Sequence, residues 1–416
     1  MSFNDLHLSP EILRAVEKAG YTTPTPIQIE AIPRILEGKD LIASAQTGTG
    51  KTAAFLLPAL SSLSKKTSKG KHPKMLILAP TRELVTQLSK ECEKYSRCTP
   101  QLKQVAIFGG MPFPAQIRAL SKPYDILIAT PGRLLDHMQR GRIHLSSIEL
   151  LVLDEADRML DMGFVHDVTA ISKACNAKRQ TLLFSATMDK SVRNLSKDLQ
   201  KDPIFIFIEP DLSLKDSIEQ RLYFVDDISH KIRLLEHMVE NFGLGKVIIF
   251  ASTKRLTSQL TKNLQEKGVL VSSLHGDMSQ AKRNKTFERL KKGKVQYLVA
   301  TDVAARGIDV TDLTHVINFD VPRQAEDYIH RIGRTGRAGA TGTAITFATY
   351  KEKPIVLRIE QITKKEIAKH TIEGMEPSKK ASFNDRKKEG FRRDARGFNP
   401  NFRKRKPKNK FSRRFR

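Results

Sequence analysis

Cysteine is scarce in this chain of 416 residues, which contains only Cys92, Cys98 and Cys175. These three form no C-x-x-C pair and have no histidine at metal-ligand spacing, so we expect a reducing compartment with neither a disulfide framework nor a zinc site. No apolar run approaches the roughly 18 residues of a membrane span. The first residues also lack the basic and apolar regions of a cleaved signal. We therefore expect a soluble, cytoplasmic protein with no membrane partner.

Acidic residues are also few, 45 against 72 Lys and Arg, which leaves a formal net charge of +27. Such a surplus suggests a polyanionic partner and says nothing about the fold. Residues 378–416 hold 17 of the basic side chains and three acids, yet the rest of the chain still carries +13. A basic tail alone is compatible with a solubilising or targeting role, whereas a basic body favours a binding surface on the folded part.

One stretch, AQTGTGKT, has the pattern of a phosphate-binding loop between a strand and a helix. Its two glycines permit positive φ, so successive N–H groups at the helix start can point at phosphate oxygens. Lys51 would then reach the β and γ phosphates of ATP, and Thr52 would hold Mg²⁺. The generic pattern begins with glycine where this one has alanine, so a plain strand-turn-helix corner stays an alternative. The candidate nucleotide contacts here are Ala45, Gln46, Thr47, Gly48, Thr49, Gly50, Lys51 and Thr52.

A carboxylate cluster follows the apolar run 150–153 and begins with Asp154 and Glu155. A carboxylate at the end of an apolar strand, downstream of a phosphate loop, is the expected ligand of Mg²⁺, here Asp154 through water. Glu155 would orient and deprotonate the attacking water. Acidic clusters are usually solvated surfaces, but this one adjoins a wholly apolar strand.

Several predicted strands end in small, hydroxyl or arginine side chains. The apolar runs are 75–79, 105–108, 125–129 and 181–184, and each is followed by such a segment. In open α/β sheets this edge is where ligands bind, and Gly, Thr and Arg suit contacts to a sugar–phosphate backbone. Taken singly, each segment is better explained as an ordinary loop or helix cap.

Two prolines constrain the backbone between Tyr21 and Gln28. An amide offers a donor and an acceptor that suit the edge of adenine, and an aromatic ring can stack on the base. A Pro-rich turn before a helix explains the same residues equally well.

The alternation of strand and helix restarts in the second half without a second phosphate loop. The expected strands there are 246–250, 269–271, 295–300, 315–319 and 343–347. This pattern suggests a duplicated fold that serves one shared site. Arginines recur three residues apart within 330–337, so we expect an anion or a carboxylate to pair with them, with a solvated basic turn as the alternative. An arginine from a second domain can complete a γ-phosphate site.

The order and spacing of these motifs resemble those of the DEAD-box RNA helicases of superfamily 2, over about residues 1–370. The matching segments are 45–52, 80–84, 130–133, 154–157 and 185–187. A phosphate loop that begins with alanine is typical of that family. Within the family, the chain is most similar to the bacterial RhlE-type proteins. The resemblance implies an α/β fold of two tandem RecA-like domains with parallel sheets and a disordered basic tail. The implied boundaries are 1–208, a linker 209–215, a C-terminal domain 216–375 and the tail 376–416.

The resemblance also implies roles for individual residues. Phe3, Tyr21 and Gln28 resemble the adenine-binding Q motif, and Asp309 resembles a ribose contact. Arg334 and Arg337 resemble arginine fingers. Positions similar to RNA contacts are Pro80, Arg82, Gly109, Gly110, Thr130, Arg133, Gly276, Arg283 and Thr301. Positions similar to residues that couple the ATP and RNA sites are Ser185, Thr187, Asp157 and His330.

The tail from residue 378 has no Leu, Ile or Val but six Phe among Arg, Lys, Gly and Asn. It cannot form a core, and interleaved aromatics and cations can bind unpaired RNA with little sequence preference. A nuclear targeting signal at 403–408 is the rival interpretation.

We expect an ATP- and Mg²⁺-dependent RNA helicase that locally unwinds RNA duplexes or remodels RNA–protein complexes. Ribosomal RNA and RNA-degradation assemblies are candidate partners. A DNA-directed translocase and an ATP-gated RNA clamp or chaperone are the alternatives.

Overall fold

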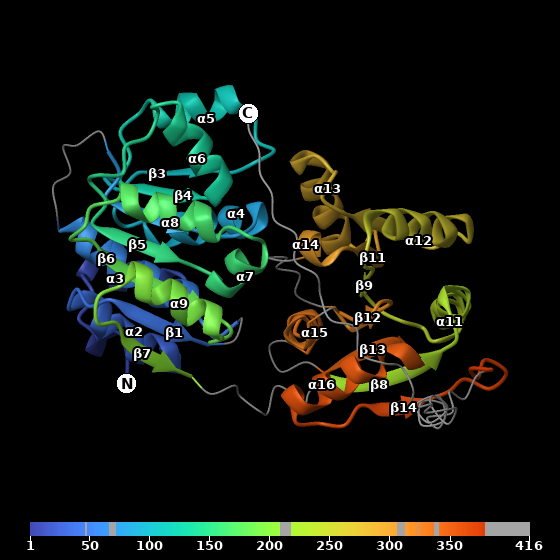
Figure 1. Cartoon of the computed structure of the whole chain (residues 1–416). Coiled ribbons are helices and arrows are strands. Elements are labelled where there is room, and N and C mark those ends of the chain that lie inside the picture. Colours follow the sequence, from blue (N-terminus) through green and yellow to red (C-terminus); the bar gives the residue numbers. More distant parts are fainter. Residues whose placement is uncertain are drawn as a thin grey trace, which may run out of the picture. The chain divides into compact units, whose positions relative to one another are not determined.

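The computed structural model describes residues 1–45, 48–65, 72–208, 218–305, 313–322, 324–336 and 341–378. Residues up to Glu376 form one compact unit, which contains two seven-stranded sheets (Figure 1). The first sheet is made of β1 (Leu41–Ser44), β2 (Met75–Leu78), β3 (Gln104–Ile107), β4 (Ile126–Ala129), β5 (Leu150–Leu153), β6 (Gln180–Ser185) and β7 (Ile204–Phe207). The second is made of β8 (Ile218–Val225), β9 (Val247–Phe250), β10 (Val271–Leu274), β11 (Tyr297–Ala300), β12 (His315–Asn318), β13 (Gly342–Thr349) and β14 (Ala368–His370).

The two sheets have the same strand order. The first runs β3-β4-β2-β5-β6-β1-β7 and the second β10-β11-β9-β12-β13-β8-β14, which is the same order seven strands later. The strand pairings of the described residues are parallel in both sheets. This confirms the predicted class of two tandem RecA-like domains. The domain boundaries stay predictions, and the linker 209–215 and the chain after residue 378 lie outside the described residues.

Helices separate the strands along the chain. Those of the first half are η1 (Phe3–Leu6), α1 (Pro10–Lys18), α2 (Pro26–Leu36), α3 (Lys51–Ser64), α4 (Arg82–Tyr95), α5 (Phe113–Leu120), α6 (Pro131–Gln139), α7 (Ala156–Asp161), α8 (Val165–Ala174) and α9 (Lys190–Leu199). Those of the second half are α11 (Ile228–Asn241), α12 (Lys254–Glu266), α13 (Gln280–Lys291), α14 (Asp302–Ala305), α15 (Ala325–Ile332), η2 (Tyr350–Glu352) and α16 (Lys353–Thr363). Across the described ranges, none of these helices has the length and apolar character that a bilayer crossing requires.

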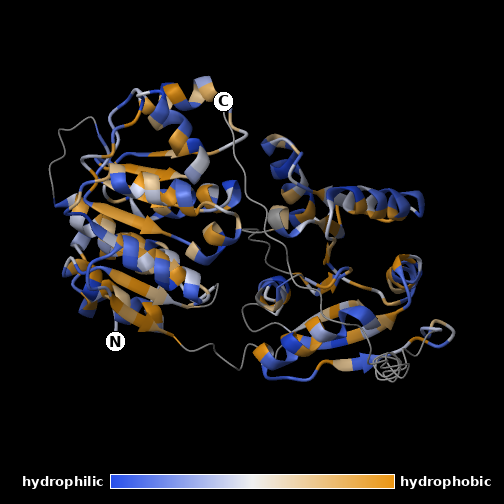
Figure 2. Ribbon diagram, in the orientation of Figure 1, coloured by the Kyte–Doolittle hydropathy of each residue, from blue (hydrophilic) through white to orange (hydrophobic). Residues whose placement is uncertain are grey.

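The first sheet has a hydrophobic core on each face. Alternate side chains of a strand point to opposite faces, so Leu41 and Ala43 pack with α2 and α3, whereas Ile42 belongs to the core beneath α6 to α9. Figure 2 shows the resulting pattern, with apolar strands inside and mixed helices around them. Burial on both faces is why parallel strands read as continuous apolar runs, and it leaves the strand ends free to carry polar chemistry.

Two strands, β8 and β14, have no counterpart among the predicted ones. β8 includes Glu219, Gln220 and Arg221, and its burial alternates along its length, so it shows no continuous apolar run. β14 has only three residues, forms an edge of the sheet and is largely exposed. Neither strand has the composition that identifies a buried parallel strand.

Candidate active site

The phosphate loop connects β1 to α3 and uses its glycines for backbone geometry. Gly48 and Gly50 have φ of +90° and +91°, values that side chains with a Cβ rarely adopt. Gly50 is the residue before α3, and a Cβ there would collide with the amide of Gln28. The described part of the loop therefore has the predicted form, while Gln46 and Thr47 lie outside the described residues.

Lys51, the first residue of α3, is buried with 7% of its surface exposed. Its Nζ has no hydrogen-bond partner among the described residues. A buried ammonium without a partner is costly unless an anion binds there. Together with the N-terminus of α3, this amine suits a phosphate group.

Gln28 links helix α2 to the phosphate loop. Its Oε1 accepts a hydrogen bond from the N–H of Thr25 at 3.0 Å, and its Nε2 donates to the carbonyl of Gly50 at 3.2 Å. Of the two predicted aromatic contacts, Tyr21 is 43% exposed, whereas Phe3 is buried in the hydrophobic core. Adenine binding by these residues stays a prediction, and Thr25 is a partner that the sequence analysis missed.

Asp154 follows β5 and is buried beside Lys51. Burial raises the pKa of Asp154 to about 7, although the charge of Lys51 opposes this shift. Its Oδ1 accepts the N–H of Glu155 at 3.1 Å. A carboxylate at this depth gains from a nearby cation, which fits the predicted contact to Mg²⁺.

Glu155 occupies a strained position before α7. Its φ of +54° places a non-glycine residue in the left-handed region, a conformation that is often found at functional sites. Its Oε2 lies 3.4 Å from Nε of Arg158, and both side chains are buried. The sequence analysis missed Arg158, which could have been suspected because it lies one helical turn after Glu155.

Asp157 joins the end of β5 to the end of β6. Its Oδ2 accepts the N–H groups of Ala186 and Thr187, both at 3.0 Å, and the Thr187 hydroxyl at 3.2 Å. Burial alone would raise the pKa of Asp157, but His330, Lys51 and Arg158 hold it below its usual value. Burial in turn lowers the pKa of His330 to about 3, with a further contribution from Arg158. Asp157, Thr187 and His330 thus share one environment, while their coupling role stays a prediction.

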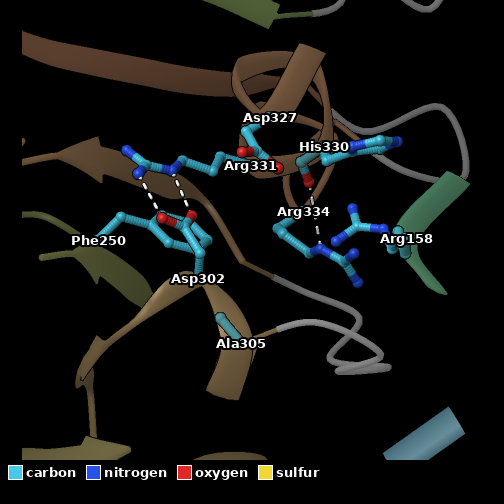
Figure 3. A pocket seen from close by; sticks show the side chains of 8 residues that line it. All are labelled: Arg158, Phe250, Asp302, Ala305, Asp327, His330, Arg331 and Arg334. Carbon is cyan, nitrogen blue, oxygen red and sulfur yellow. Dashed lines mark hydrogen bonds and ion pairs between the residues drawn. The ribbon is translucent and has the colours of Figure 1, made fainter. Parts of the chain in front are cut away.

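The recurring arginines have different partners, as Figure 3 shows. Arg331 forms two hydrogen bonds with Asp302, at 2.6 and 2.7 Å, so a carboxylate pairs with it as expected. Arg334 donates to the carbonyl of His330 at 3.3 Å and lines a pocket together with Arg158. Two further predicted contacts, Arg337 and Asp309, lie outside the described residues.

The six predicted RNA contacts of the first half follow the neighbouring strands β2, β3 and β4. The guanidinium of Arg82 packs against Gly109 and Gly110; an added Cβ would clash with it at Gly110 and contact it tightly at Gly109. Arg133 donates to the carbonyl of Met111 at 3.3 Å, and Gln116, which the sequence analysis missed, donates to the same carbonyl at 3.0 Å. Pro80 follows β2, and Thr130 follows β4 directly before α6.

The predicted RNA contacts of the second half also lie at strand ends. Gly276 follows β10 and Thr301 follows β11, whereas Arg283 lies in the first turn of α13. Arg283 is 5% exposed and donates to the carboxylate of Glu83 at 2.7 Å and to the carbonyl of Ala304 at 3.1 Å. Its guanidinium is therefore already held in place.

A parallel α/β fold with a phosphate loop on its first sheet defines a P-loop nucleotide-binding protein. The family model for DEAD/DEAH box helicases matches residues 25–195, and the model for the helicase conserved C-terminal domain matches residues 230–339. The chain belongs to the DEAD-box ATP-dependent RNA helicases, which are RNA-stimulated ATPases.

Curated relatives cover most of the chain. The CshA helicase of Geobacillus kaustophilus is 42% identical over 366 residues, which are 88% of this chain and 77% of the relative. The SrmB helicase of Haemophilus influenzae is 41% identical over 91% of this chain and 86% of the relative. The RhlB helicase of Pseudomonas syringae is 45% identical over 83% of this chain and 88% of the relative.

Solved structures match both halves. Saccharomyces cerevisiae Dbp5 bound to RNA and ADP BeF3 has a TM-score of 0.78 at 30% identity, covering 89% of this chain and 95% of that one. The DEAD-box helicase Mss116 bound to ssRNA and UDP-BeF has a TM-score of 0.80 at 31% identity, covering 90% and 80%. These matches confirm the predicted fold and family.

Proposed function

We propose that the first half of this helicase binds ATP through the phosphate loop and hydrolyses it at Glu155. The observation that carries the proposal is the buried amine of Lys51, which has no hydrogen-bond partner among the described residues and lies beside buried Asp154. Lys51 and the N–H groups at the start of α3 bind the β and γ phosphates.

Mg²⁺ fits the donor set at this site. Thr52 is the second residue of α3, next to Lys51, and its hydroxyl is one candidate ligand. The Asp154 carboxylate is the other, and it is buried without an ion pair among the described residues. Hard oxygen ligands of this kind suit Mg²⁺, which keeps several water ligands of its own. When bound, the ion supplies positive charge that neutralises the phosphate oxygens.

Glu155 orients and deprotonates the attacking water. Arg158 lies 3.4 Å from the Glu155 carboxylate and fixes the position of that side chain. Arg334 stabilises charge that develops on the transferred phosphoryl group, as an arginine finger does. Asp157 transmits the change to the end of β6 through its three hydrogen bonds.

RNA contacts both halves through the strand-end residues around Arg82 and around Gly276. Their glycines and arginines suit a sugar–phosphate backbone, which needs close approach and donors more than base-specific edges. Hydrolysis-coupled release of that strand separates duplexes or remodels RNA–protein complexes.

The variant Glu155→Gln tests the proposed base. The amide keeps the shape of the side chain but cannot accept the proton, so ATP turnover should fall by about 10²- to 10⁴-fold while ATP and RNA binding persist. Steady-state ATPase assays with and without RNA measure the turnover, and nucleotide titrations measure binding.

Asp167→Asn is the matched control, because it removes a carboxylate from the neighbouring helix α8 rather than from the end of β5. It should retain the turnover of the unmodified protein. Wild-type turnover in Glu155→Gln would exclude Glu155 as the base.

Several finer assignments remain part of this proposal. We favour a cytoplasmic protein of the RhlE-type subfamily that acts on ribosomal RNA or within RNA-degradation assemblies. The basic chain after residue 378 adds RNA affinity with little sequence preference, because 17 cations follow that point. Deletion of residues 378–416 should weaken RNA binding and flatten its dependence on salt.

A further inference from the structure

Helix α13 concentrates the positive charge of the folded part of the chain. Residues 280–294 contain seven Lys or Arg and one acid, a net +6, whereas all of residues 1–377 together carry +13. A segment of 15 residues thus supplies almost half of that surplus. Only one of the seven cations, Arg283, is buried and paired with Glu83.

Four of the exposed cations form one stripe along the helix. Lys282, Lys285, Arg289 and Lys292 follow one another at spacings of three, four and three residues, which places them on one face. An adjacent face of the helix carries the buried side chains Arg283, Thr286 and Leu290. The stripe spans roughly 15 Å along the helix axis.

The stripe differs from the basic residues of the neighbouring helix α12. There Lys262 pairs with Glu266 at 3.7 Å, and Lys267, just after the helix, pairs with Glu236 at 3.0 Å and Glu240 at 2.9 Å. Of the four stripe cations, only Lys292 has an ion pair within the described residues, with Glu288 at 3.7 Å. Lys262 and Lys267 are neutralised internally, whereas three of the four stripe cations have no ion pair within the described residues and are available to an external anion.

The surface chemistry identifies the anion. The exposed large apolar side chains of the described chain lie elsewhere, at Ile228, Phe242, Leu270 and Leu357 in this half, and none lies on α13. Protein interfaces are anchored by apolar and aromatic side chains, and unpaired RNA is bound by stacking on aromatic rings. A row of cations without either feature suits the outside of an RNA duplex, which presents phosphates and 2′-hydroxyls.

We propose that the α13 stripe, formed by Lys282, Lys285, Arg289 and Lys292, binds the backbone of an RNA duplex that adjoins the bound strand. The inference rests on the proposed function, because Gly276, which precedes α13, and Arg283, in its first turn, are proposed contacts of that strand. The stripe recruits structured RNA without contributing to hydrolysis.

A triple variant, Lys282→Gln, Lys285→Gln and Arg289→Gln in the full chain, tests the proposal. The probes are a short unstructured RNA strand and the same strand extended into a hairpin at either end, each titrated over a salt series with a non-hydrolysable ATP analogue. Affinity for one of the hairpin RNAs should fall on the order of ten-fold at ~0.1 M salt, with a salt slope smaller by about 2 to 3. Affinity for the strand alone should change by less than about two-fold.

The control triple, Lys262→Gln, Lys267→Gln and Lys369→Gln, removes the same charge from lysines of the same half that have ion pairs. It should leave both affinities near those of the unmodified protein. Equal hairpin affinity in the two triples would overturn the proposal and favour an acidic protein partner, and an equal loss on all RNAs would assign the stripe to the strand site. If the strand alone fails to stimulate the ATPase of the unmodified protein, the proposed function fails instead.

Discussion

The two halves of the molecule place different chemistry at the same position of the same fold. β1 and β8 have equivalent positions in the two sheets, and each leads into a helix. After β1 come the positive-φ glycines and Lys51, whereas after β8 comes Asp227, whose side chain caps α11 by accepting the N–H of His230 at 2.9 Å. The turn after β1 therefore leaves backbone N–H groups for a ligand, whereas in the turn after β8 the Asp227 side chain accepts a backbone N–H of the helix.

Both halves contain a buried lysine near a buried or partly buried aspartate, but among the described residues only the pair of the second half forms an ion pair. In the second half, Nζ of Lys231 lies 3.2 Å from Oδ1 of Asp320, which follows β12, the counterpart of β5. Burial would raise the pKa of Asp320, but Ser252 and Lys231 together hold it below its usual value. In the first half, Lys51 has no partner among the described residues and burial raises the pKa of Asp154 to about 7.

This difference shows how a duplicated fold keeps one nucleotide site instead of two. In the second half, the ion pair between Lys231 and Asp320 avoids the free-energy cost of an unpaired buried charge. In the first half, Lys51 carries that cost in the unbound protein, and bound phosphate and Mg²⁺ would offset it. The missing hydrogen-bond partner of Lys51 within the described residues is thus what a binding site for an anion requires.

The largest expected effect comes from replacing the two lysines in turn. Lys51→Ala should lower ATP turnover by about 10³-fold or more, roughly 4 kcal/mol, because phosphate charge loses its cation. Its thermal unfolding without nucleotide should be unchanged or slightly higher, since a buried unpaired charge is removed. ATPase assays and thermal melts measure the two quantities.

Lys231→Ala is the matched comparison and should show the reverse pattern. Loss of the partner of Asp320 should lower the free energy of unfolding by about 2 to 3 kcal/mol, while turnover of the folded protein persists. A folded but inactive Lys231→Ala, or a strongly destabilised Lys51→Ala, would contradict the distinction between a lysine that binds a ligand and a lysine that stabilises the fold.

Asp154 and Asp320 should affect the free energy of unfolding in opposite directions, both when the pH changes and when each is replaced by asparagine. The raised pKa of Asp154 means that its ionisation opposes folding as pH rises from about 4 towards 7, by on the order of 1.4 kcal/mol per pKa unit. Asp154→Asn should therefore stabilise the nucleotide-free, metal-free protein at pH 8. The lowered pKa of Asp320 means that its stabilisation is present above about pH 4 and is lost as pH falls further, so Asp320→Asn should destabilise at pH 8.

Denaturant titrations of both variants at pH 8 and at pH 5 measure these changes. The stabilisation by Asp154→Asn should shrink at pH 5, where the wild-type carboxyl is largely protonated, and the loss in Asp320→Asn should remain. The comparison fails if both variants shift the free energy of unfolding in the same direction at pH 8.

The sequence predicted the parts of the site that depend on neighbouring residues. The phosphate loop, Lys51 and the carboxylates after β5 follow one another directly, and apolar runs identified most strands because both faces of the sheets are buried. Strand β8 was not predicted because Glu219 and Arg221 lie on its more exposed face and the buried Gln220 also interrupts any apolar run.

Pairings that join distant segments could not be derived from one sequence. Lys231 and Asp320 are 89 residues apart, and Arg331 and Asp302 are 29 apart. Only the folded sheet brings such side chains together, so the sequence could not tell which lysine would have a partner. The hydrogen bond from the Gln28 amide to the carbonyl of Gly50, 22 residues later, is a contact of the same kind, while its other hydrogen bond is to the nearby Thr25.

The smallest expected effect compares one glycine from each half. Gly110 and Gly268 have φ of +84° and +78°, so alanine should strain either backbone by about 1 kcal/mol. An added Cβ at Gly110 would meet the Arg82 guanidinium, whereas a Cβ at Gly268 would have nothing within 4 Å. Because Arg82 is a flexible side chain, it should move and leave the position from which we propose that it binds RNA, while the fold persists.

Both variants should therefore lose similar stability in denaturant titrations, but only Gly110→Ala should weaken RNA binding, by about 1 kcal/mol or roughly five-fold. Nucleotide affinity in the absence of RNA should be the same in both, since neither glycine contacts the phosphate loop. If Gly110→Ala binds RNA as tightly as Gly268→Ala, then Arg82 is not held for RNA by the glycine pair, and the strand ends of the first half owe their RNA affinity to other side chains.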